Sequence, residues 1–213
     1  MLRVYYTELP QDFVFDERRL ILSDYRKEKL RGVKLPLKRL QMLAAESLLN
    51  QAVCEWDPDA NLPLDIQTGE KGKPFFSLLP LFFSLSHSGP YVACAIADWE
   101  IGLDIQKQSA PHETLVKRFF SEDERRFIRE STDRDTAFTG IWCMKESYLK
   151  ATGDGLSRSM SEVSLDLREP VTLVYSDTVR FWQFGNEHFQ MAVCSLDGGV
   201  PLPEKIVRAE LRP

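Results

Sequence analysis

Residues 136–151 are the segment that most constrains the fold, because they combine a helical apolar pattern with ionisable side chains. Apolar residues recur along it at steps of three and four: Phe138, Ile141, Trp142, Tyr148 and Leu149. Such spacing predicts a helix, and we expect it to continue as far as Gly153. On that helix Trp142, Glu146 and Lys150 lie one above the next. An acid and a base four residues apart are also common as an exposed pair on a solvated helix.

A second ionisable group lies in an apolar setting about forty residues earlier. The stretch 101–105 reads Ile-Gly-Leu-Asp-Ile and predicts a short strand. Alternation places Gly102, Asp104 and Gln106 on one face of it. A carboxylate there needs a partner, and glycine leaves room for something to approach closely. A metal ion or a lysine would serve; an edge-strand Asp facing water is the alternative.

Length and composition allow one domain or two small lobes. The 213 residues are 43% hydrophobic, which is enough to form a sizeable core. Neither a signal-peptide pattern nor an apolar run of about 20 residues is visible, so we expect a soluble cytoplasmic protein with no membrane partner. The four cysteines lie far apart with no Cys-x-x-Cys, which favours buried thiols over a zinc site or a disulfide framework.

Positive charge is concentrated near the amino terminus. The net charge is -5, yet nine Lys and Arg against two acidic residues lie between Arg18 and Arg39, so this segment carries +7 and the rest of the chain -12. An acidic protein with one basic segment suits a small polyanion better than a nucleic-acid duplex. A solvated basic helix face is the alternative.

Two further segments offer donors for an anion. Residues 69–74 form a glycine-rich basic loop that could bring backbone amides and Lys73 to a phosphate, although such a sequence is also typical of a simple turn. Ser86 and His87 lie at the end of a predicted strand. A catalytic Ser-His pair is the rival interpretation, but adjacent strand residues point to opposite faces, so we favour anion binding.

The predicted elements divide the chain into two similar halves. We expect helices over 23–34, 37–53, 114–121 and 136–151, strands over 2–6, 64–67, 82–88, 91–97, 101–105, 163–167, 171–175, 179–184 and 188–196, and a polar tail from 198. Residues 91–96 and 189–196 echo one another after their respective helices. The sequence therefore predicts an α+β fold with two pseudo-twofold lobes, 1–105 and 106–213, each a small, mainly antiparallel sheet with packed helices. A ligand site is expected in the cleft near Asp104.

Taken together, these motifs resemble a known family. The resemblance rests on Gly72-Lys-Pro74, Phe83-Ser-Leu-Ser-His-Ser88, Ile101-Gly-Leu-Asp-Ile105, Arg118-Phe-Phe-Ser-Glu-Asp-Glu124 and Trp142-Cys-Met-Lys-Glu-Ser-Tyr-Leu-Lys150. In this order and at these spacings they look like the 4′-phosphopantetheinyl transferases, in particular the long, pseudo-dimeric surfactin-synthetase-activating type. The Gly-x-Asp motif and the Trp-x-x-Lys-Glu-x-x-x-Lys motif are specific as a pair.

The resemblance implies an activity and a set of site residues. It implies transfer of the phosphopantetheine arm of coenzyme A to a serine of an apo acyl or peptidyl carrier protein, with release of 3′,5′-ADP, by a monomer. Asp104 and Glu146 would hold Mg²⁺, or Mn²⁺; Glu146 or a water on it would take the serine proton; and Lys150 would neutralise pyrophosphate charge. The 3′-phosphate would be bound by Lys73, Ser86 and His87. Further contacts to the phosphates would come from Arg39, Arg26 and Lys29. Glu124 matches an acidic family position near the active site.

Gln106 departs from the family pattern, which often has a second acidic residue there. Because an amide oxygen is a poorer ligand than a carboxylate, we expect two carboxylates on the metal and Gln106 in contact at most through water. A carrier dock is expected on a basic stretch that could equally be a solvated helix: Lys117, Arg118, Arg125, Arg126 and Arg129. Two other functions stay open, a coenzyme A or nucleotide-binding module without turnover and a metal-dependent phosphohydrolase.

Overall fold

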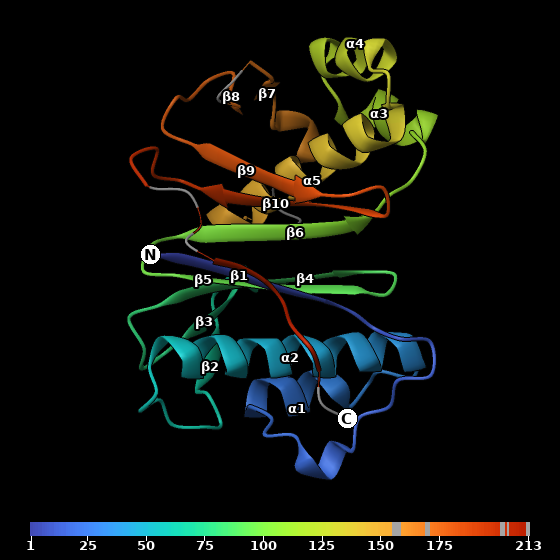
Figure 1. Cartoon of the computed structure of the whole chain (residues 1–213). Coiled ribbons are helices and arrows are strands. Elements are labelled where there is room, and N and C mark those ends of the chain that lie inside the picture. The colour runs from blue at the N-terminus through green and yellow to red at the C-terminus, as the bar shows by residue number, and fades with distance from the viewer. Residues whose placement is uncertain (155–158, 169–170, 201–202, 204, 212–213) are drawn as a thin grey trace.

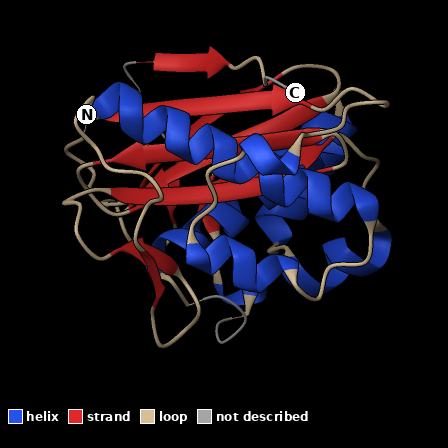
Figure 2. Cartoon of the chain, turned by 90° about the horizontal axis from the view of Figure 1, so that it is seen from below, coloured by secondary structure: helices blue, strands red, loops and turns tan. Residues whose placement is uncertain are grey.

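The chain folds into four layers, which are helices, a sheet, a second sheet and further helices (Figure 1). This is a computed structural model, and it describes residues 1–154, 159–168, 171–200, 203 and 205–211. The helices over the first sheet are α1 (Asp24–Leu30) and α2 (Pro36–Trp56); those over the second are α3 (Glu113–Phe119), α4 (Glu122–Glu130) and α5 (Arg134–Thr152). From below, helices lie in front of the strands (Figure 2).

The two main sheets have four and three strands. The first has the order β11-β1-β5-β4, with β1 Leu2–Glu8, β4 Phe82–Ser88, β5 Tyr91–Ala97 and β11 Lys205–Arg208. The second has the order β6-β10-β9, with β6 Ile101–Lys107, β9 Arg180–Gly185 and β10 Phe189–Ser195. Their neighbouring strands are antiparallel, except that β1 and β11 are parallel.

Smaller elements complete the described part of the chain. They are the hairpin β2 (Ile66–Thr68) with β3 (Pro74–Phe76), the pair β7 (Leu165–Asp166) with β8 (Thr172–Leu173), and the 3-10 turns η1 (Glu17–Arg19) and η3 (Met160–Glu162). No described helix has both the length and the apolar character needed to cross a membrane.

The two sheets pack face to face through small and branched apolar side chains. β5 is buried along its whole length, with Val92, Cys94 and Ile96 in the core under α2 and its alanines facing the second sheet. β10 is buried in the same way between α5 and the first sheet. Strands buried on both faces read as continuous apolar runs, which explains why these two segments echo one another. The predicted α+β fold with two lobes is confirmed.

The sheets do not follow the division of the chain at residue 105. β6 begins at Ile101 and pairs with β10, so its first residues belong to the second sheet. Near the carboxyl terminus β11 returns to the first sheet and pairs with β1 from Arg3 to Tyr6. The prediction of a polar tail from 198 is therefore wrong for 205–208, because a short edge strand needs only one apolar face and gives a weak sequence signal. The lobe boundaries 1–105 and 106–213 stay a prediction. Below, the first lobe means the first sheet with α1 and α2, and the second lobe means the second sheet with α3, α4 and α5.

Helix α5 lies against β6 at unusually short range. It begins at Asp133, whose side chain accepts a hydrogen bond from the Thr136 amide, and it ends at Gly153 in the left-handed conformation (φ 70°). A Cβ atom on Gly102 would lie 1.9 Å from the Ser147 carbonyl oxygen and 2.4 Å from the Ala151 nitrogen. The expectation that Gly102 leaves room for a close neighbour is met by the backbone of α5.

We expect Gly102→Ala to lower the free energy of unfolding by about 3 kcal/mol, since the extra methyl group meets helix backbone that cannot move aside. Urea unfolding followed by circular dichroism measures this loss. Gly32→Ala is the matched control, because a Cβ there meets nothing within 4 Å. A Gly102→Ala protein as stable as Gly32→Ala would contradict the close packing of α5 on β6.

Candidate active site

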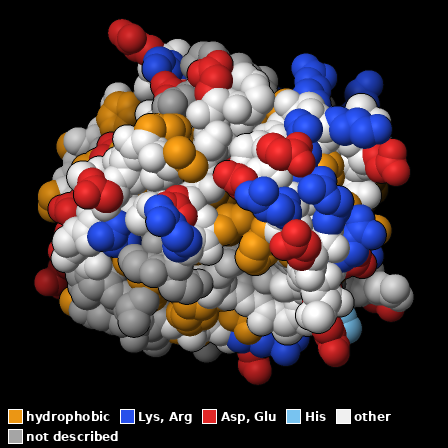
Figure 3. Space-filling model, turned by 90° about the horizontal axis from the view of Figure 1, so that it is seen from above, with side chains coloured by type: hydrophobic (Ala, Val, Ile, Leu, Met, Phe, Trp, Pro, Cys, Tyr) orange, Lys and Arg blue, Asp and Glu red, His pale blue; other side chains and the backbone are white. Residues whose placement is uncertain are grey.

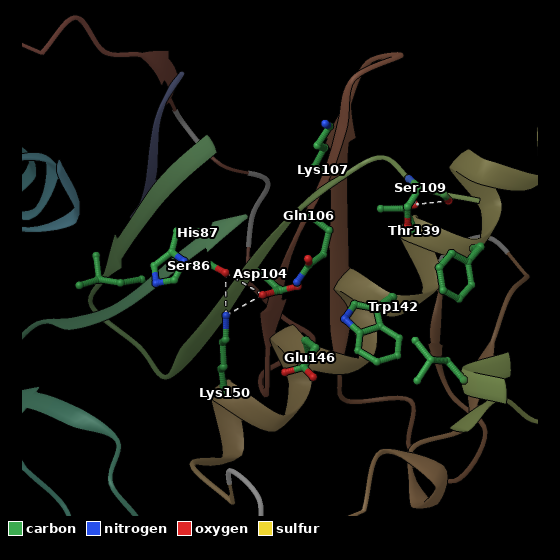
Figure 4. Close-up of a pocket in the computed structure, with 13 residues that line it drawn as sticks. Ser86, His87, Asp104, Gln106, Lys107, Ser109, Thr139, Trp142, Glu146 and Lys150 are labelled. Atoms are coloured by element: carbon green, nitrogen blue, oxygen red, sulfur yellow. Dashed lines mark hydrogen bonds and ion pairs between the residues drawn. The ribbon is translucent and has the colours of Figure 1, made fainter. Parts of the chain in front are cut away.

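The cavity that we call the main cavity, because both lobes line it, lies where the edge strand β4 of the first sheet meets β6 and α5 of the second lobe. A larger cavity of about 940 Å³ lies beside Arg39. The main cavity has a volume of about 620 Å³, and its lining includes Ser86, Asp104, Gln106, Trp142, Glu146 and Lys150 (Figure 4). The two lobes are linked at this point, because the Leu103 amide of β6 donates a hydrogen bond to Ser84 Oγ of β4 at 2.9 Å. Both lobes therefore contribute side chains to this one cavity.

Asp104 is the centre of the hydrogen-bond network in the main cavity. Its carboxylate is 2% exposed. Oδ1 accepts hydrogen bonds from Ser86 Oγ at 2.7 Å and from Lys150 Nζ at 2.6 Å, and Oδ2 accepts one from Gln106 Nε2 at 2.9 Å. Lys150 also donates to Ser86 Oγ at 2.8 Å, which closes a triangle of contacts (Figure 4). The partner expected for this carboxylate is thus Lys150.

Glu146 faces the same cavity from α5, one helical turn before Lys150 (Figure 4). Burial raises the pKa of its carboxyl group, the negative charge of Asp104 raises it further, and Lys150 acts in the opposite direction. Two carboxylates that repel one another in a half-buried site favour a bound cation. Because Mg²⁺ takes one or two carboxylates together with water and phosphate oxygens, this pair fits a divalent ion. Among the described residues, no three His, Cys, Asp or Glu side chains are grouped as a metal site.

His87 borders a second cavity, which we call the side cavity. It has a volume of about 320 Å³ and basic residues on its walls, among them Arg26, Lys71, Lys73, His87 and Lys150. Loss of hydration lowers the pKa of the His87 imidazole, and the positive charges of Lys150, Lys38 and Arg26 lower it further. A wall lined by several basic side chains offers donors to an anion.

Several of the basic residues are held by acidic partners. Arg26 is 6% exposed, and its Nε donates to Glu46 at 3.1 Å, so its guanidinium is fixed at the wall of the side cavity. Lys73 Nζ donates to Glu100 at 2.6 Å and to the Ala151 carbonyl at the end of α5 at 2.8 Å. Lys73 therefore ties the 69–74 loop to the second lobe.

Of the residues predicted from the sequence, the structure brings Asp104, Glu146, Lys150 and Ser86 together in the main cavity. Ser86 contacts Asp104 and Lys150, whereas His87 is exposed and borders both cavities. Arg26 and Lys73 line the side cavity, whereas Lys29 and Arg39 lie apart from both linings. Lys29 lies over the Tyr25 ring at 5.7 Å, and Arg39 pairs with Glu17 at 2.6 Å. The phosphate and metal roles of all these residues stay predictions.

Sequence reasoning missed a buried ion pair next to the site. Lys145 and Glu124 are both 0% exposed and lie 2.9 Å apart, and Lys145 also donates to the Phe119 carbonyl at 2.8 Å. Glu124 forms a capping box with Ser121 and accepts a hydrogen bond from the Leu165 amide. It therefore lies in the core of the second lobe and not in the main cavity. The sequence did contain a signal for this pair. Lys145 interrupts the apolar stripe of α5, and a lysine buried in that stripe needs an acidic partner.

Comparison with known proteins shows which family part of the chain resembles. Residues 100–195 match the family model described as the 4′-phosphopantetheinyl transferase superfamily. A 4′-phosphopantetheinyl transferase of Bacillus subtilis is 34% identical over 59% of this chain and 60% of its own length, and the psf-1 enzyme of Bacillus pumilus is 34% identical over 63% of each. The 4′-phosphopantetheinyl transferase Sfp of Bacillus subtilis strain 168 is 37% identical over 48% of this chain and 47% of its own length.

These matches span less than two thirds of each of these relatives. Among solved structures, the holo-[acyl-carrier-protein] synthase of Thermotoga maritima matches 45% of this chain and 61% of that chain, with 22% identity and a TM-score of 0.39. The matched segment 100–195 contains Asp104, Glu146 and Lys150. The resemblance to the 4′-phosphopantetheinyl transferase superfamily therefore covers the part of the chain that carries these three residues.

Proposed function

We propose that the protein transfers the 4′-phosphopantetheine arm of coenzyme A to a serine of an apo acyl or peptidyl carrier protein. The observation that carries this proposal is the convergence of Asp104, Glu146 and Lys150, from two distant segments, in one cavity beside a basic side cavity. Carboxylates for a divalent ion next to cations for phosphates are what attack on a diphosphate requires. The resemblance of residues 100–195 to the 4′-phosphopantetheinyl transferase superfamily supports the same reaction. We expect the protein to act as a monomer.

The transfer exchanges one phosphorus–oxygen bond for another. The serine oxygen forms a bond to the phosphorus that carries the pantetheine, and the bond from that phosphorus to the bridging oxygen breaks. The bridging oxygen leaves with its electron pair as part of 3′,5′-ADP. The serine proton passes to Glu146 or to a water that Glu146 holds, and the raised pKa of this carboxyl group suits a proton acceptor.

The remaining residues bind and orient the diphosphate. Asp104 and Glu146 would hold Mg²⁺, which when bound stabilises negative charge on the diphosphate oxygens. Lys150 lies on the wall shared by both cavities, so its ammonium can reach a diphosphate there. Gln106 already donates its amide to Asp104, which favours a role in orienting that carboxylate.

The test combines the protein with fluorescent coenzyme A, Mg²⁺ and an apo carrier protein, and labelled carrier is read on a gel. We expect labelling, and we expect Asp104→Ala and Glu146→Ala each to lower turnover roughly a hundredfold or more, while coenzyme A binding weakens less. Glu187→Ala removes an exposed carboxylate and serves as the control. Ligand binding without any labelled carrier would favour a non-catalytic module, and release of phosphopantetheine without carrier would favour a phosphohydrolase.

The side cavity suits the 3′-phosphate end of coenzyme A. His87→Ala should raise the KM for coenzyme A about tenfold, since a hydrogen bond to a charged group is lost, and should leave the KM for 3′-dephospho-coenzyme A unchanged. His188→Ala removes an exposed imidazole and is the matched control. Equal effects on both substrates would argue against the assignment. Lys73→Ala, Lys29→Ala and Arg39→Ala, measured in the same way, test the other predicted phosphate ligands.

The carrier is expected to dock over α3 and α4. Lys and Arg side chains gather on one side of the face seen from above (Figure 3), and α3 contributes Leu115 to the main cavity. Phe127 of α4 is 46% exposed among these basic residues. Several of them are paired, as Arg129 is with Glu122 at 3.3 Å, whereas Arg118 lies over the Phe119 ring at 5.0 Å. A basic surface with an apolar centre suits an acidic carrier helix.

We expect Arg118→Glu to raise the KM for the carrier protein roughly fivefold or more, because it places like charges opposite each other, without changing the KM for coenzyme A. Steady-state labelling kinetics at low and high salt measure both constants. Arg168→Glu, which changes an equally exposed arginine near β7, is the control for net charge. The same rise in both variants would mean that docking depends on overall charge and not on α3 and α4.

A further inference from the structure

Each oxygen of the Asp104 carboxylate already accepts at least one hydrogen bond from a protein donor. Ser86 and Lys150 donate to Oδ1, and Gln106 donates to Oδ2, all at 2.6 to 2.9 Å. Ser86 and Gln106 belong to β4 and β6, and the sheets hold both strands in place. A cation that binds Asp104 has to share an oxygen with one of these donors or replace it.

Lys150 is the donor best able to leave. It is the one charged group of the three, it reaches Asp104 through a long flexible side chain, and that side chain is 32% exposed. Its ammonium lies on the wall shared by the main cavity and the side cavity. A small rotation of the lysine side chain can therefore carry the positive charge from Asp104 to an anion in either space.

The local charges make this movement depend on the ligands. Asp104 and Glu146 carry two negative charges and Lys150 one positive charge, so adding a divalent ion alone leaves an excess positive charge beside the ammonium. Adding a diphosphate diester with its two negative charges supplies a new partner for Lys150. Like charges a few ångströms apart in a half-buried site repel one another strongly, because little water screens them.

We propose that Lys150 and the divalent ion compete for Asp104 Oδ1, and that the substrate diphosphate removes this competition by drawing the Lys150 ammonium away. Metal and substrate then bind cooperatively, and each raises the affinity of the other by the same factor. The inference rests on the proposed function for the identity of the two ligands. The protein's own lysine thereby delays metal binding until a diphosphate is present.

The test measures Mn²⁺ affinity, from the electron paramagnetic resonance signal of free Mn²⁺, with and without coenzyme A and with no carrier present. For the unmodified protein we expect coenzyme A to tighten Mn²⁺ binding about tenfold, within the usual range of coupling between sites. Lys150→Met should bind Mn²⁺ alone about tenfold more tightly than the unmodified protein, and coenzyme A should add much less. Lys150→Gln, which keeps a polar side chain, should behave in the same way.

Two matched variants separate competition from general electrostatics. Lys107→Met removes a lysine that lines the same cavity, and Asp104→Asn removes the proposed ligand charge. We expect Lys107→Met to change Mn²⁺ affinity less than threefold and Asp104→Asn to lose most of it. If Lys150→Met and Lys150→Gln bind Mn²⁺ no more tightly than Lys107→Met, the proposal is wrong. Carrier labelling by the unmodified protein, together with Mn²⁺ affinity that Lys150→Met and Lys150→Gln leave unchanged, would overturn only this inference. Cooperative Mn²⁺ binding by the unmodified protein without carrier labelling would overturn only the transferase function.

Discussion

The approach of α5 to β6 at Gly102 is the contact on which the site depends. The Ser147 and Ala151 backbone atoms meet this glycine, and Thr139 near the start of α5 is hydrogen-bonded to Ser109 beyond β6, so helix and strand run antiparallel. Two strand residues advance about 7 Å and one helical turn about 5.4 Å. Contact at Gly102 therefore brings the last turns of α5 over Asp104. A larger residue at 102 would lift the helix and separate the charged groups.

Neighbouring charges on α5 have opposite environments. Lys145 points into the second lobe, where it joins α4 and the turn after η3 through Glu124 and the Val163 carbonyl, while Glu146 points into the main cavity. Turning α5 about its axis would separate Lys145 from Glu124 and leave two buried charges uncompensated. The pair therefore fixes the rotation of the helix. That rotation decides which residues face Asp104. Arg26 and Glu46 fix the first lobe in a similar way beside the side cavity.

The two lobes supply complementary parts of the site. Alternation along β4 places Ser86 against Asp104 and leaves His87 exposed at the boundary of the side cavity, so the two cannot act as a nucleophile and its base. The second lobe contributes both carboxylates and Lys150. Because β4 and β6 are edge strands of different sheets, the site exists only where the sheets meet.

The sequence by itself determined the helix 136–151, the alternation around Asp104, and the strands 91–97 and 188–196. It also determined that the strand carries one carboxylate of the site and the helix carries a second carboxylate and a lysine. These are local patterns, and local periodicity records which face of an element is buried. Only the tertiary structure decided that 205–208 pairs with β1, that Glu124 belongs to a buried pair, that Lys73 contacts the end of α5, and that Lys29 and Arg39 lie apart from the two cavities. Each of these depends on a partner distant in the chain, and the identity of a charged residue's partner is set by packing and not by sequence spacing.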